Sequence, residues 1–238
     1  MVLRIRAEEF NPNDLKAGST VALFLDLTPS ASGEPDSIPV LEATGLKPGK
    51  TLVVMAGVHG DEYEGVRAIQ DVFRQLDPQI MSGRLVAVPV ANLSAYLVGN
   101  RISPADHLNL ARIFPGNPNG STTERLAYHL GKSIIAHGDF FVDLHSAGIK
   151  YQFPALVGYD ASDTVPGKIS KEAALVFGAP VTWGHPKISP GRSISEAASR
   201  RIPWLYTEAS GAGRIAPEDL RHFSTGLLNL RPPDLGEF

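Results

Sequence analysis

Two short segments of the chain carry side chains of the types that bind zinc in proteins. His59 and Glu62 follow the apolar run 51–58, and His145 directly follows a second, mostly apolar run, 140–144. Two imidazoles and one carboxylate form many catalytic zinc sites, because three protein ligands leave one coordination position open. There zinc lowers the pKa of a water molecule to about 7 and polarises a carbonyl group. The sequence therefore predicts one catalytic Zn²⁺ per chain.

Either segment alone has an ordinary explanation. A histidine at the end of a strand is more often a surface or hydrogen-bonded residue than a ligand, and the spacing H-x-x-E is common by chance. Zinc is favoured because both segments are expected at carboxyl ends of strands, the edge where open parallel sheets build their sites. Asp143 lies on the same strand face as His145, so it either orients this ligand or caps a neighbouring loop.

Two further segments supply charged groups that a hydrolytic zinc site needs. Arg101 and Arg112 belong to the loop-like segment 101–116, where they either bind a substrate carboxylate through their planar guanidinium groups or remain surface arginines. Glu208 follows the apolar run 202–207. It is either a proton carrier whose pKa is raised by burial or a loop carboxylate that accepts backbone hydrogen bonds.

Strands and helices are expected to alternate along the chain, as judged from hydrophobic periodicity and from Gly, Pro and capping residues. The predicted strands cover residues 21–27, 51–58, 84–90, 140–146 and 202–207. The predicted helices cover residues 66–76, 121–138, 166–177 and 217–230. Such alternation predicts an α/β fold with a mostly parallel or mixed open sheet and with helices on both faces.

Composition narrows the class of protein. The 238 residues, 43% of them hydrophobic and 20% charged, are expected to form a single domain, 1–238. A net charge of −3 gives no basic surface for nucleic acid or for an anionic membrane, so small molecules are the expected partners. Since the chain has no cysteine, disulfides and thiolate ligands are excluded. No apolar run resembles a signal peptide or a membrane span, so a cytoplasmic location is expected. Whether chains form a homo-oligomer is left open.

The charged segments together resemble the succinylglutamate desuccinylase and aspartoacylase family, a branch of the zinc carboxypeptidase fold. The resemblance covers roughly residues 50–230 and rests on four segments in the family's order: 57–65, 101–116, 143–146 and 207–211. It implies a zinc carboxypeptidase-like fold. It also implies a zinc-dependent hydrolase, a deacylase that cleaves the amide bond of a small N-acyl amino acid or a related N-acyl amine.

The resemblance also implies roles for individual residues. It makes His59, Glu62 and His145 the zinc ligands and Glu208 the general base and acid. Arg101 would polarise the scissile carbonyl and stabilise the oxyanion. Arg112 would bind the carboxylate of the substrate, and Arg192 resembles a further substrate-binding arginine.

The chain departs from the family pattern in two places. Where relatives commonly have Asn-Arg, this chain has Ala111-Arg112, so one donor to the substrate carboxylate is missing unless Asn109 substitutes for it. The β-rich C-terminal domain usual in the family is expected to be absent, since the sequence ends at Phe238. Either this domain is lacking, or the chain is shortened, or another subunit supplies it.

Two other functions compete with the deacylase. A metallocarboxypeptidase acting on peptides would use the same metal and glutamate, and it would need an open groove where a deacylase needs a closed pocket. A relic of the fold that only binds a metal or a small ligand is the alternative without catalysis. It is disfavoured because all three candidate ligands and Glu208 are present.

Overall fold

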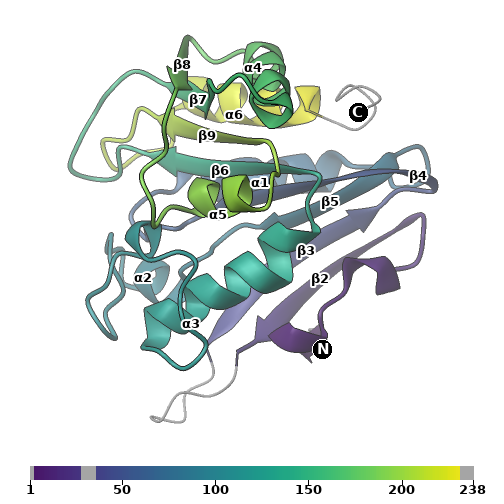
Figure 1. Cartoon of the computed structure of the whole chain (residues 1–238), viewed down its shortest axis with the longest axis horizontal. Helices are drawn as coiled ribbons and strands as arrows, with labels where there is room; N and C mark the ends of the chain where they lie inside the picture. The colour runs from purple at the N-terminus through teal and green to yellow at the C-terminus, as the bar shows by residue number, and fades with distance from the viewer. Residues whose placement is uncertain (1–2, 28–35, 231–238) are drawn as a thin grey trace.

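The computed structural model describes residues 3–27 and 36–230 (Figure 1). Within these ranges the chain forms one nine-stranded sheet in the order β1-β2-β3-β5-β4-β6-β9-β7-β8. The strands are β1 (Leu3–Arg6), β2 (Ser19–Asp26), β3 (Ser37–Thr44), β4 (Lys47–Ala56), β5 (Ser82–Val88), β6 (Phe140–Ser146), β7 (Leu156–Asp160), β8 (Val181–His185) and β9 (Trp204–Ala209). Each strand predicted from the sequence overlaps one of these.

Helices cover both faces of the sheet. They are α1 (Glu64–Gln75), α2 (Leu93–Leu97), α3 (Thr122–His129), α4 (Val165–Phe177), α5 (Ser193–Ser199) and α6 (Pro217–Asn229). Helices α3 and α5 pack on one apolar core, in front of the sheet in Figure 1, and α1, α4 and α6 pack on a second core at the opposite face. The predicted α/β fold, an open sheet with helices on both faces, is confirmed. No helix in the described ranges is long and apolar enough to cross a membrane.

The middle of the sheet determines where the charged segments meet. Strands β5, β4, β6 and β9 are parallel neighbours, and the antiparallel strands β3 and β7 flank them, so the sheet is mixed. The carboxyl ends of β4, β6 and β9 therefore lie side by side at one edge. In this register His145 of β6 is opposite Glu208 of β9.

The predicted helix over 121–138 is correct only in its first half. A capping box formed by Ser121 and Glu124 begins α3, as the sequence predicts. After His129 the chain continues as a π-helical turn over Leu130–Ile134 and a 3-10 turn over Ile135–His137. The wider turn changes the angular spacing of the side chains, and Leu130, Ile134 and Ile135 are all fully buried. Packing against the sheet thus overrides regular α-helical geometry.

Several elements were not predicted from the sequence, namely β1, β3, β7, β8, α2 and α5. Strand β3 begins inside the segment Pro29–Pro39, whose Pro, Ser and Gly residues indicate a loop; residues 29–35 lie outside the described residues. Only residues Leu41–Thr44 of β3 pair with β5, and Pro39 precedes them, so it fits into the strand. At Pro39 the strand pairs only with β2, and proline is tolerated at such edge-like positions.

Candidate metal centre

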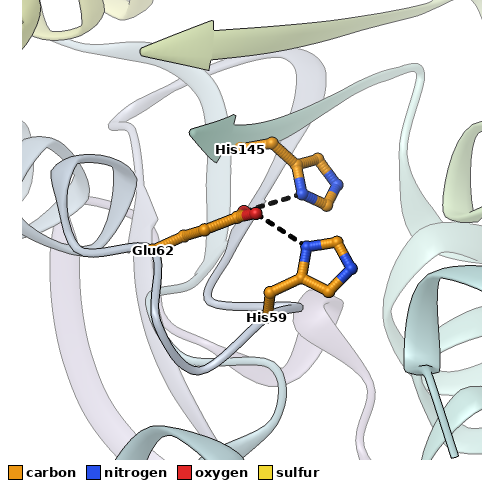
Figure 2. Close-up of side chains that lie close together, drawn as sticks. All are labelled: His59, Glu62 and His145. Atoms are coloured by element: carbon orange, nitrogen blue, oxygen red, sulfur yellow. Dashed lines mark hydrogen bonds and ion pairs between the residues drawn. The ribbon is translucent and has the colours of Figure 1, made fainter. Parts of the chain in front are cut away.

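His59, Glu62 and His145 converge at the carboxyl edge of the sheet (Figure 2). His59 follows β4, Glu62 lies just before α1, and His145 lies in β6. The Nδ1 atom of His59 is 2.8 Å from Oε1 of Glu62, and the Nδ1 atom of His145 is 2.9 Å from Oε2 of the same carboxylate. One ligand atom from each residue lies within 4.8 Å of the other two. The three side chains could therefore share one metal ion.

The other nitrogen of each imidazole is held by an oxygen acceptor. Nε2 of His59 is 3.1 Å from Oδ1 of Asn109, an oxygen that also accepts the backbone N–H of Ala111 at 2.9 Å. Nε2 of His145 is 3.0 Å from Oδ2 of Asp143. Each ring therefore has an oxygen acceptor at both nitrogens, Glu62 at Nδ1 and Asn109 or Asp143 at Nε2. With Nε2 donating to Asn109 or Asp143, the Nδ1 atom of each ring could bind a metal ion that Glu62 also binds. Two imidazole nitrogens and one carboxylate are a donor set that fits zinc.

Burial and neighbouring charges set the protonation of the three groups. Burial would raise the pKa of Glu62, but His145 and His59 outweigh it and hold this pKa well below its usual range. Burial lowers the pKa of His59 despite the adjacent Glu62. Burial opposes the charged form of His145 as well, yet the Asp143 and Glu62 carboxylates raise its pKa well above the usual value. A metal cation bound to Glu62 would supply the positive charge that a protonated His145 ring supplies without it.

Glu208 lies beside the three candidate ligands on the next strand. Glu208 of β9 pairs with His145 of β6, so the two side chains leave the same face of the sheet. Burial raises the pKa of Glu208 to about 8, with Glu62 and Asp143 adding to the effect and His145 and Arg101 opposing it. Within the described residues its buried Oε2 atom has no hydrogen-bond partner. Glu208 thus keeps one unpaired carboxyl oxygen in the cleft.

Three arginines surround the cleft. Nη1 of Arg101 lies 2.9 Å from Oε1 of Glu62, and Arg112 and Arg192 line the same cavity of about 60 Å³. The backbone brings the last two together: a Cβ at Gly191 would lie 2.3 Å from the carbonyl oxygen of Arg112, so only glycine fits there. Burial lowers the pKa of Arg112, and the charges of Arg192 and Arg101 lower it further. Such mutual repulsion among cations favours an anionic ligand.

The structure brings nearly all of the predicted residues to one place. The cavity is lined by His59, Arg101, Arg112, His145, Arg192 and Glu208, and Glu62 is buried against its two histidines. Asn109 differs, because its carbonyl oxygen is bonded to His59 and to the backbone of residue 111. Its contact with substrate stays a prediction, and its contact with His59 is a role that the sequence did not indicate.

Sequence reasoning missed two residues of the cavity that make specific contacts. The hydroxyl of Ser193 donates to Oδ2 of Asp143, the oxygen that holds His145. Tyr206 lines the cavity from β9. Its position two residues before Glu208, on the same strand face, was a signal in the sequence that could have revealed it.

Comparison with known proteins agrees with this geometry. The model of the succinylglutamate desuccinylase/aspartoacylase catalytic domain matches residues 48–232. The chain belongs to this family. The match includes every residue that we assign to the metal centre and to its surroundings, so the predicted resemblance is confirmed.

Individual relatives resemble the chain over most of its length. An N-alpha-acetyl-L-2,4-diaminobutyric acid deacetylase of Halomonas elongata is 33% identical over 183 residues, which is 76% of this chain and 54% of that protein. The chain therefore spans about half the length of this relative. A succinylglutamate desuccinylase/aspartoacylase structure from Rhodobacter sphaeroides has a TM-score of 0.81 and 31% identity, covering 91% of this chain and 66% of that one.

A third relative is known in a product-bound structure. The ectoine utilization protein EutE (DoeB) of Ruegeria pomeroyi has a TM-score of 0.82 and 26% identity, and the match covers 91% of this chain and 68% of that one. The similarity in fold thus extends beyond the metal centre to almost the whole sheet and its helices.

Proposed function

We propose that this chain is the catalytic part of a zinc-dependent hydrolase, a deacylase that cleaves the amide bond of a small N-acyl amino acid or a related N-acyl amine. The observation that carries the proposal is the convergence of His59, Glu62 and His145, whose Nδ1 atoms lie 2.8 and 2.9 Å from the Glu62 carboxylate, with the unpaired carboxyl oxygen of Glu208 in the same cleft. Membership of the family and similarity to the Halomonas elongata deacetylase support amide hydrolysis.

His59, Glu62 and His145 would hold the ion. When bound, zinc supplies a Lewis acid that activates water and polarises the amide carbonyl. Glu208 would accept a proton from water and return it to the departing amine, one group acting first as base and then as acid. Burial already raises its pKa to about 8, and a nearby cation would move that value downward, toward neutrality. Both protonation states are then accessible at neutral pH.

The arginines would bind and orient the substrate. Arg101 lies at the mouth of the cleft with 43% of its side chain exposed, and it can turn from Glu62 toward the carbonyl oxygen of a bound amide. There it would stabilise the negative charge that develops on this oxygen. Arg112 and Arg192 would hold a carboxylate of the substrate. Asn109 would keep the ring of His59 in position.

Similarity to the Halomonas elongata deacetylase favours a small N-acyl substrate over a peptide. We further propose that residues 1–238 form a single catalytic domain, since one continuous sheet crosses the described residues. The cytoplasmic location, the absence of nucleic-acid and membrane partners and the oligomeric state stay predictions.

The test combines metal analysis with substrate screening. The zinc-loaded chain is assayed against N-acetyl and N-succinyl amino acids and against dipeptides, and Glu208→Gln is assayed in parallel. We expect hydrolysis of an N-acyl amino acid and a loss of about 10²–10⁴-fold in kcat for Glu208→Gln, with one zinc per chain in both.

A matched variant controls for the loss of any glutamate. Glu172→Gln alters an exposed residue of α4 and should leave kcat unchanged. Near-parental turnover by Glu208→Gln would contradict the proposed role of Glu208, and its loss of zinc would make Glu208 a ligand instead. Faster hydrolysis of dipeptides than of N-acyl amino acids would favour the carboxypeptidase.

A further inference from the structure

Tyr206 extends the wall of the cleft toward the far edge of the sheet. It lies on β9, two residues before Glu208, and it lines the same cavity. Its hydroxyl is 3.0 Å from Nε2 of His185, the last residue of β8. Strand β7 lies between β9 and β8, so the tyrosine side chain spans a whole strand to make this contact.

A glycine clears the path of the Tyr206 ring. Gly158 of β7 pairs with Tyr206, and a Cβ at this glycine would lie only 1.9 Å from Cε1 of the ring. Any other residue at position 158 would therefore displace the tyrosine. The ring lies over Gly158 of β7, and this places its hydroxyl beside His185 of β8. The two strands are thus shaped to hold this side chain in one position.

His185 itself has two aromatic neighbours. The exposed Trp183 stacks on its ring with centroids 5.1 Å apart and an interplanar angle of 25°, and the ring of Tyr206 lies 5.3 Å away at a tilt of 56°. Burial and the charge of Arg192 lower the pKa of His185, which favours the neutral ring. If Nε2–H donates to the tyrosine oxygen, the hydroxyl proton of Tyr206 is free to point into the cleft.

Arg192 gives this part of the cleft its charge. It lines the cavity together with Tyr206, and its charge acts on His185, Tyr206 and Arg112. Burial and the nearby Glu208 raise the pKa of Tyr206 to about 12, so the hydroxyl keeps its proton. A neutral donor beside a guanidinium group is an arrangement that binds an oxygen anion.

We propose that the Tyr206 hydroxyl donates a hydrogen bond to the substrate carboxylate that Arg192 faces, and that His185 is a positioning residue that aims this hydroxyl. The inference rests on the proposed function and deepens it, because it assigns a carboxylate-specific contact to the β8 side of the cleft. A substrate with this carboxylate is then preferred to the same N-acyl compound whose carboxylate is replaced by a carboxamide.

Tyr206→Phe tests the contact, since it removes the hydroxyl and keeps the ring. Each N-acyl amino acid that the parent hydrolyses is compared with its carboxamide. For the acid we expect KM to rise about 10-fold or more with kcat nearly unchanged, and for the carboxamide we expect no change. His185→Phe should raise KM for the acid by less, and the double variant should be no worse than Tyr206→Phe alone, because His185 acts only through Tyr206.

Controls separate this contact from a structural role. Tyr159→Phe removes a hydroxyl from β7, the neighbouring strand, and should change neither KM nor kcat. Zinc content and melting temperature of Tyr206→Phe should match the parent. Equal effects on acid and carboxamide, or no effect on either, would overturn the inference while leaving the proposed function in place. A parent chain that hydrolyses none of the N-acyl compounds would overturn both.

Discussion

Two buried glutamates, each paired with an arginine, differ in their protonation. Glu62 and Glu42 have side chains that are each 2% exposed; Glu62 lies 2.9 Å from Nη1 of Arg101, and Glu42 lies 3.3 Å from Nε of Arg84. Burial raises the pKa of both. For Glu62 the two histidines reverse this effect, whereas for Glu42 the charge of Arg84 and the hydroxyl of Thr44 only reduce it, and its pKa is raised to about 7.

The difference indicates that an arginine partner alone does not offset the effect of burial on the pKa of a carboxyl group. Glu62 contacts two imidazoles as well as Arg101, so both of its oxygens face groups that can carry positive charge. Glu42 lies within β3, where Arg84 is its ion-pair partner and Thr44 its hydrogen-bond partner, and the charge of Asp14 raises its pKa further. Location in the sheet explains the contrast, because loops from several strands converge only at the carboxyl edge.

The largest effect is expected from removing the charge of Glu62. Glu62→Gln keeps the shape of the side chain but replaces a strong zinc ligand by a neutral amide, so zinc content should fall from one ion per chain to a small fraction. Activity on any N-acyl substrate should fall with it. Elemental analysis after gel filtration measures the bound zinc.

Glu42→Gln is the matched control for this loss. It makes the same chemical change at an equally buried carboxyl group that is not part of the candidate metal centre, so zinc content should stay at the parental value. If Glu62→Gln retained a full equivalent of zinc, the assignment of the metal centre would be wrong. If both variants lost zinc, the effect would reflect folding and not ligation.

A smaller effect is expected from the arginines of the cleft. Arg101→Ala should lower kcat because it removes an oxyanion donor. The loss of such a donor costs roughly 2.7–4 kcal/mol of transition-state stabilisation. Arg112→Ala should mainly raise KM, since a contact with the substrate carboxylate is made equally in the ground state and in the transition state. Steady-state kinetics on one N-acyl amino acid measure both. Similar, small effects of the two variants would mean that Arg101 and Arg112 are surface arginines that do not contact the substrate.

Much of the candidate site could be predicted because its signals are local. His59, His145 and Glu208 each follow an apolar run, and parallel strands bring their carboxyl ends to one edge without any further information. The central strands and the helices α1, α4 and α6 were also predicted from local signals: apolar runs for the strands, helical hydrophobic spacing for α1, and proline, glycine or acidic residues at the ends of α4 and α6. The positions of Arg101 and Arg112 depend on a long loop, and their placement in the cleft needed the structure.

The unpredicted parts depend on contacts between distant segments. Strand β8 is short and mostly exposed, so Val181–His185 shows no alternation of buried and exposed residues. Its place beside β7, and the antiparallel position of β7 beside β9, are decided by packing of the whole sheet. Without that order, His185 and Tyr206 are two unrelated residues in the sequence. The pair Glu42 and Arg84 was missed likewise, because β3 begins in a segment rich in turn-forming residues.

The smallest effect concerns the pH dependence of stability through Glu42. Its pKa in the folded state, about 7, lies above the ordinary value of 4.5, so folding favours the protonated form. The resulting contribution to the free energy of unfolding is complete below about pH 4.5 and is lost as the pH rises through 7. Glu42→Gln cannot ionise. Between pH 5 and pH 8 the variant should therefore gain stability relative to the parent, by on the order of 1–3 kcal/mol.

Urea unfolding of both proteins at pH 5, 6, 7 and 8 measures this difference. Other groups with shifted pKa values, such as Glu64 and Glu208, titrate in both proteins, so the comparison isolates Glu42. Arg84 keeps two partners in the variant, Oγ1 of Thr44 at 3.1 Å and Oδ1 of Asn13 at 3.0 Å, and is not left buried without acceptors. Parallel curves for the two proteins would mean that Arg84 keeps Glu42 ionised throughout. The contrast between the two glutamates would then lie in their neighbours alone and not in their charge.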